Sequence, residues 1–73
     1  MNENIEIATE TIQLGQFLQI ANVIETGGMA KWFLSEYPVF VNGEREDRRG
    51  KKISIGDVVE VEGVGTFTVV RES

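Results

Sequence analysis

The chain has 73 residues, 41% of them hydrophobic, and a formal net charge of −5 at pH 7; these values suit one small domain over residues 1–73 and exclude wholesale disorder. It contains no cysteine and no histidine, which excludes disulfides and thiolate metal sites and removes the usual general base, so we predict no metal, no cofactor, no catalytic residue and no enzymatic activity. There is neither a secretory leader pattern nor a run of about 20 apolar residues, so we expect a cytoplasmic protein without a membrane partner.

The N-terminal third of the chain predicts one strand and one helix. Residues 5–7 alternate apolar and polar side chains, which indicates a short strand. Thr9 and Thr11 are candidate caps for the helix, and Asn22, which tolerates left-handed backbone, is expected to end it. The helix is predicted over about residues 12–21 because four apolar residues fall on one stripe at 100° per residue; they are Leu14, Phe17, Leu18 and Ala21.

A second helix is predicted over about residues 29–36, directly after Gly27-Gly28. The two glycines indicate a tight connection, so the helices should be neighbours in space. Trp32 adjoins Lys31 on the outer side of this helix; we expect Trp32 to be largely buried against a neighbouring element, with stacking on an unpaired base as the alternative. The buried stripe of the helix is formed by Ala30, Phe33 and Leu34.

Short strands joined by turns are predicted for the rest of the chain. Pro38 ends the second helix because it disfavours helical backbone in the residue before it. Asn42-Gly43 accept positive φ and predict a tight hairpin between strands at residues 39–41 and 44–46. Ile53 and Ile55 lead into a turn at Gly56-Asp57, and two more strands follow at residues 58–61 and 67–70. Two helices followed by short antiparallel strands indicate an α+β fold.

Residues 45–52, which we call the basic loop, carry five of the seven cations of the chain. With two acids in the same segment the basic loop has a charge of +3, whereas the remainder has a charge of −8. Such a loop would attract a polyanion to one edge of an acidic protein. Alternatively its Arg side chains pair with Glu44, Glu46 and Asp47, although such surface pairs contribute only about 0–1 kcal/mol. The loop cations are Arg45, Arg48, Arg49, Lys51 and Lys52.

Three motifs of this chain resemble the S4 RNA-binding domain family. They are Ala30-Lys31-x-x-Leu34, Val39-x-Val41-Asn42-Gly43 and Gly56-Asp57-x-Val59-x-Val61. The strings TGGxAK and VNGExExRRGKK are similar to the small stand-alone bacterial, YaaA-type branch of that family. The resemblance covers about residues 5–70 and implies two helices packed on a small twisted antiparallel sheet. Two departures are visible: Leu14-Gly15-Gln16 replaces the Arg-Leu-Asp triplet that opens many S4 domains, and Lys31 stands where Arg is usual.

The resemblance implies a non-catalytic module that docks structured RNA, ribosomal RNA among the candidates, through the basic loop and the second helix. An anion at the start of the second helix would meet Lys31, although the sequence favours Gly27-Gly28 as plain turn residues between the helices. A protein-interaction module that uses the basic loop to bind an acidic protein partner stays open as the alternative. The candidate RNA-binding residues are Lys31, Arg45, Arg48, Arg49, Lys51, Lys52, Gly27 and Gly28.

Overall fold

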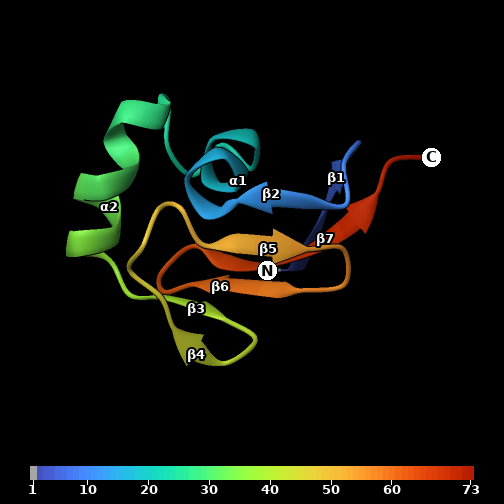
Figure 1. Cartoon of the computed structure of the whole chain (residues 1–73). Coiled ribbons are helices and arrows are strands. Elements are labelled where there is room, and N and C mark those ends of the chain that lie inside the picture. The colour runs from blue at the N-terminus through green and yellow to red at the C-terminus, as the bar shows by residue number, and fades with distance from the viewer. Residues whose placement is uncertain (1) are drawn as a thin grey trace.

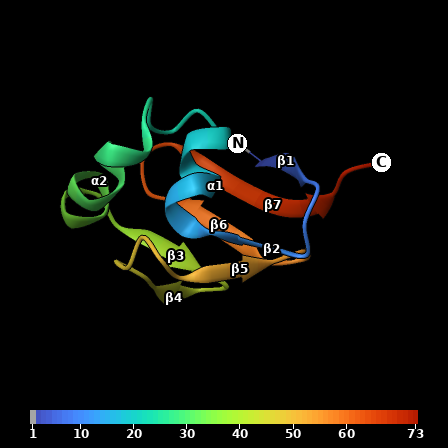
Figure 2. The same ribbon diagram turned by 45° about the horizontal axis from the view of Figure 1, so that its top comes forward.

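The computed structural model describes residues 2–73 and combines two helices with two sheets (Figure 1). The larger sheet has the strand order β1-β7-β6-β3-β4, and the smaller one pairs β2 with β5. Both helices lie on the same side of the larger sheet (Figures 1 and 2). The strands are β1 (Asn2–Ile7), β2 (Thr11–Gln13), β3 (Val39–Val41), β4 (Glu44–Arg45), β5 (Lys52–Ser54), β6 (Val58–Val61) and β7 (Gly65–Arg71). The helices are α1 (Leu14–Ile20) and α2 (Ala30–Glu36), the latter preceded by the 3₁₀ turn η1 (Gly27–Met29).

The larger sheet is mixed, which corrects the prediction of an antiparallel sheet. Strand β3 pairs antiparallel with β4 and β6, and β6 pairs antiparallel with β7. Strand β1, however, runs parallel to β7, with Asn2 opposite Thr66 and Ile7 opposite Arg71. Antiparallel pairs can be joined by tight turns, whereas a parallel pair needs a long connection. Here the connection consists of all the elements between β1 and β7. Turn signals between neighbouring strands could therefore not predict this pairing.

Helix α1 begins two residues later than predicted because residues 11–13 pair as a strand. Ile12 lies opposite Ile53 in the β2–β5 ladder. Thr9 does not cap the helix; its hydroxyl donates to the carbonyl oxygen of Thr11 at 2.6 Å. The N-cap position is Gln13, whose side chain makes no capping hydrogen bond. Tertiary pairing with β5 therefore overrides the local capping signal.

Two asparagines adopt the left-handed backbone that the sequence predicted. Asn22 has a φ of 61° just after α1, and Asn42 has a φ of 52° in the β3–β4 hairpin. The Asn42 side chain also accepts from the backbone N–H of Val58 at 2.9 Å and donates to Asp57 at 3.1 Å. Asp57 in turn accepts from the backbone N–H of Ser54 at 2.7 Å, which closes the turn that the sequence predicted at Gly56-Asp57. These bonds hold the hairpin against the β5–β6 connection.

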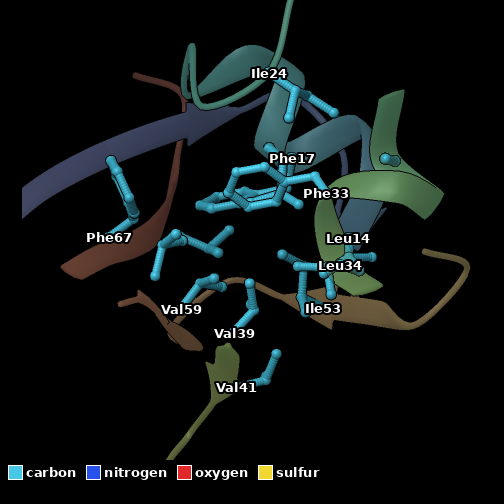
Figure 3. Packing of buried hydrophobic residues seen from close by; sticks show 14 of the residues in the cluster. Leu14, Phe17, Ile24, Phe33, Leu34, Val39, Val41, Ile53, Val59 and Phe67 are labelled. Carbon is cyan, nitrogen blue, oxygen red and sulfur yellow. The ribbon is translucent and has the colours of Figure 1, made fainter. Parts of the chain in front are cut away.

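The core lies between the helices and the inner face of the larger sheet (Figure 3). Phe17 meets Phe67 edge-to-face with ring centroids 6.3 Å apart. Phe40, in contrast, is only half-buried. Side chains alternate along β3, so Val39 and Val41 take the inner face and Phe40 takes the outer one. The largest fully buried side chains are Phe17, Leu14, Leu18, Leu34, Ile53, Val39, Val59, Val61 and Val69.

Candidate nucleic-acid interface

Backbone hydrogen bonds tie the basic loop to helix α1 and to strand β3 of the hairpin. At its start, the N–H of Glu46 donates to the carbonyl oxygen of Val39 at 2.8 Å. Further on, the N–H groups of Leu14 and Gly15 donate to the carbonyls of Lys51 and Arg49 at 2.8 and 2.9 Å. These two donors belong to the first turn of α1, where N–H groups have no partner within the helix. The loop thus supplies the missing acceptors for α1 and is held in place by them.

Gly15 allows α1, α2 and the basic loop to approach each other closely. A Cβ atom at this position would lie 3.1 Å from the Cβ of Ala30 and 3.4 Å from the Cβ of Arg49. Sequence analysis did not identify Gly15 as part of the site. A signal was present, because a glycine inside a predicted helix costs about 1 kcal/mol relative to alanine and so needs a packing reason.

Within the loop, Arg48 and Glu46 form the one salt bridge found in residues 2–73. The carboxylate of Glu46 accepts from Nε of Arg48 at 3.0 Å, from its Nη2 at 3.2 Å and from its backbone N–H at 3.0 Å. The side chain of Glu46 is only 11% exposed, whereas that of Arg48 is 72% exposed. The alternative of paired loop arginines, which the sequence left open, is therefore realised for Arg48.

This pairing shifts the pKa of both partners. The side-chain hydrogen bond from Arg48 is the main reason that the pKa of Glu46 falls from 4.5 to about 2. The backbone hydrogen bond from Arg48 and the charge of Lys51 act in the same direction, and partial burial opposes them. The same side-chain hydrogen bond raises the pKa of Arg48. Glu46 is therefore ionised at neutral pH, and its hydrogen bonds to Arg48 stabilise the conformation of the loop.

The remaining loop cations are divided between two hollows. Arg45, Lys51 and Lys52 line a hollow of about 390 Å³ between the β3–β4 hairpin and β5, together with Arg48. Arg49 lines a second hollow of about 450 Å³ on the helix side. Among residues 2–73, none of these four unpaired cations lies within salt-bridge distance of an acid. The helix-side hollow is completed by Gln13, Gly15, Gln16, Gly27, Ala30 and Gly50.

The candidates on the second helix are placed less closely together. Gly27 borders the helix-side hollow with Arg49. Gly28 and Lys31 are exposed, and Lys31 borders neither hollow. The structure therefore brings Gly27 and Arg49 together, but it does not join Lys31 to the loop cations. In both views the connection from β4 to β5, which contains most of the basic loop, rises beside α2 (Figures 1 and 2).

Trp32 is 53% exposed, so the prediction that it is largely buried is wrong. Its ring contacts Tyr37 edge-to-face, with centroids 6.1 Å apart and planes at 76°. At 100° per residue, Trp32 points away from Ala30 and Leu34, which face the core. The helix is buried on one stripe only, and Trp32 lies outside it.

The charged lining of the hairpin-side hollow distinguishes it from the mostly apolar pockets that hold small molecules. In the part of the chain that the structure describes, no group of three acidic side chains could hold a metal ion. Across residues 2–73, no helix is long and apolar enough to cross a membrane. What the site offers is a fixed loop with separated cations, which suits contact with several phosphate groups.

Comparisons with known proteins agree with this architecture. A family model described as "S4 domain" matches residues 5–70. The chain is also 61% identical, over 71 residues, to a Bacillus subtilis (strain 168) protein named "Probable ribosome maturation protein RlbA". That alignment covers 97% of this chain and 100% of the relative.

Proposed function

The chain belongs to the S4 domain family, and on that basis we propose that it binds structured RNA, ribosomal RNA in particular, without catalysing a reaction. The observation that carries this proposal is the basic loop. Four of its cations have no acid partner in residues 2–73, although the rest of the chain has a charge of −8. Surface charge of one sign gathered on a fixed loop suits a polyanion.

In this proposal the two hollows contact different phosphate groups. The guanidinium of Arg49 makes a bidentate contact with one phosphate, beside the amide side chains of Gln13 and Gln16, which can donate to the same group. Lys51 and Lys52 contact further phosphates as point charges on the hairpin side, with Arg45 beside them. RNA duplexes hide their base edges in a deep, narrow groove, so recognition rests on the shape of the backbone.

Glu46 and Arg48 have a different part in this mechanism. Three hydrogen bonds join them, so the loop is ordered before RNA arrives. Pre-ordering lowers the entropy cost of binding, which is about 0.5–1.5 kcal/mol for each long side chain that must be fixed. Arg48 is therefore chiefly a positioning residue, and its phosphate contact is weaker than those of Arg49 or Lys52.

The second helix contributes at the edge of the interface. Gly27 supplies backbone beside Arg49 that a phosphate can approach closely, because glycine has no side chain. Gly28, which is exposed, likewise has no side chain to keep a phosphate away from the backbone. Lys31 attracts RNA at longer range from the exposed side of α2. The name of the Bacillus relative, which refers to ribosome maturation, directs the choice of RNA towards the ribosome.

A matched pair of variants tests the proposal. Arg49→Gln and Arg71→Gln remove the same charge, but Arg71 lies at the end of β7 and outside both hollows. In filter binding with purified bacterial ribosomal RNA, we expect Arg49→Gln to weaken affinity about five- to tenfold, the scale of one charge-assisted contact. Arg71→Gln should change affinity by less than about twofold. Equal affinity of both variants and the unaltered protein for RNA would refute the proposal.

The basic loop could instead dock an acidic protein, and one further measurement separates the two functions. The protein is used to capture partners from bacterial lysate with and without ribonuclease. Loss of the captured material on ribonuclease treatment supports RNA binding. Protein partners that persist after ribonuclease treatment, but are lost with Arg49→Gln, support the protein-binding alternative.

A further inference from the structure

The side of α2 away from the basic loop carries an exposed aromatic pair. Trp32 is 53% exposed and Tyr37 is 42% exposed, and their rings contact each other edge-to-face. Tyr37 also stacks on buried Phe33, with centroids 4.7 Å apart and planes at 22°. Tyr37 is therefore packed against the core, and Trp32 packs on Tyr37. We call Trp32 and Tyr37 the aromatic pair.

A carboxylate lies on the same side of α2 as Trp32. Glu36 is exposed, directly precedes Tyr37 and lies four residues after Trp32, so it shares the Trp32 side of α2. Glu36 takes part in no salt bridge within residues 2–73. The nearest cation along the helix, Lys31, is turned about 100° from Trp32 around the helix axis.

We propose that the aromatic pair, with Glu36 beside it, docks an arginine-bearing basic segment of a protein partner. A guanidinium group can lie flat on an indole or phenol ring and at the same time form two hydrogen bonds to a carboxylate. Trp and Tyr are also the residues that dominate protein interfaces when they are exposed and rigid. The negative charge of the carboxylate and the aromatic rings therefore both favour an arginine side chain.

The same charges disfavour RNA at this surface. A base stacked on Trp32 would bring its phosphate close to Glu36, and like charges repel. The loop cations lie in the two hollows, and neither Trp32 nor Tyr37 borders those hollows. The proposal is therefore independent of RNA binding by the basic loop, and it assigns the opposite face of α2 to a partner of opposite charge.

The chain has one tryptophan, so the indole N–H signal in an NMR spectrum reports on Trp32 alone. The probes are a synthetic peptide with three Arg-Leu-Gly repeats, the same peptide with Glu in place of Arg, and oligouridylate RNA. We expect the Arg peptide to change the chemical shift of the indole N–H signal in a saturable way, and the Glu peptide to leave it unchanged. A change of chemical shift with oligouridylate but not with the Arg peptide would overturn the proposal in favour of base stacking.

Charge reversal distinguishes a docking site from general attraction to an acidic protein. Glu36→Lys and Glu72→Lys change the net charge equally, but Glu72 follows β7 and is remote in sequence from α2. By peptide anisotropy, Glu36→Lys should weaken the Arg peptide about fivefold or more, the scale of a cation–π contact with its ion pair. Trp32→Ala should have a similar effect while the circular dichroism spectrum is unchanged. Equal weakening by Glu36→Lys and Glu72→Lys would overturn the proposal, even if Trp32→Ala failed to fold.

Discussion

The backbone N–H of Gly15 donates to the carbonyl oxygen of Arg49 at 2.9 Å, and this hydrogen bond joins α1 to the basic loop. The approach is possible because Gly15 has no side chain to separate α1 from Ala30 and Arg49. Any side chain at this position must push the helices or the loop apart. The stability of the fold and the placement of the loop cations are therefore linked through one residue.

We predict that Gly15→Val destabilises the protein by about 1–3 kcal/mol, the usual cost of forcing extra carbon atoms into a packed contact. Urea unfolding measures this change. The control is Gly50→Ala, because a Cβ at Gly50 would meet no atom within 4 Å and should change stability by less than about 0.5 kcal/mol. If Gly15→Val were as stable as Gly50→Ala, the close approach would be of no consequence.

The Glu46–Arg48 pair predicts a loss of stability in acid. The pKa of Glu46 is about 2 in the folded protein and 4.5 without its partners, so at pH values above 4.5 the carboxylate is ionised whether or not the chain is folded. As the pH falls from 4.5 towards 2, the unfolded chain binds the proton first, and the stabilisation is lost across that window. Because Arg48 is largely exposed, we expect Glu46→Gln to cost no more than about 1 kcal/mol at pH 7.

Urea unfolding of the unaltered protein and of Glu46→Gln from pH 7 down to pH 2 measures this effect. The gap in stability between the two should close as the pH approaches 2, where Glu46 loses its charge. Glu44→Gln serves as the control, since Glu44 is exposed and forms no salt bridge within residues 2–73. A gap for Glu46→Gln that stayed constant across this pH range would contradict the assignment.

The hydrogen bond between Asn42 and Asp57 predicts an energetic coupling between the hairpin and the β5–β6 turn. A double-mutant cycle with Asn42→Ala and Asp57→Ala should give a coupling of about 0.5–1.5 kcal/mol, the net value of one hydrogen bond. The cycle removes the separate cost of placing alanine at the positive φ of Asn42. A cycle that pairs Asn42→Ala with Asp47→Ala should show no coupling. Additive effects of Asn42→Ala and Asp57→Ala would mean that the bond is not formed in solution.

RNA binding should depend on salt in proportion to the number of loop cations that contact phosphates. Four such contacts give a slope of roughly −3 to −4 in a plot of log affinity against log salt concentration. Arg49→Gln should make the slope shallower by roughly 0.7–0.9, the value for one phosphate contact. Arg48→Gln should change the slope by less, because its guanidinium is bound to Glu46. Equal changes for these two variants would show that Arg48 contacts RNA directly.

Sequence analysis succeeded where structure follows from nearby residues. The two helices, the Asn42-Gly43 hairpin and the strands that follow are present because apolar spacing and turn chemistry are local properties. It was wrong where distant segments compete for the same residues. Residues 11–13 leave the predicted helix to pair with β5, and β1 pairs with β7 at the other end of the chain.

The candidate site was predictable in composition but not in arrangement. The sequence located the basic loop, yet it could not choose which arginine pairs with an acid. Arg48 was selected because its backbone N–H and side chain reach the same carboxylate of Glu46, which is a matter of loop geometry. The exposure of Trp32 was missed because a residue beside the buried stripe can face a neighbouring element or water, and helical spacing does not distinguish these.

The parallel pairing of β1 with β7 has a consequence for synthesis on the ribosome. Residues 2–7 leave the ribosome before their partner strand, residues 65–71, and all the other elements of the fold are made between them. This edge of the sheet therefore cannot close until β7 has been made, and its closure carries the entropy cost of a loop that contains all the intervening elements. If β7 is removed, β1 should have no strand to pair with in the sheet.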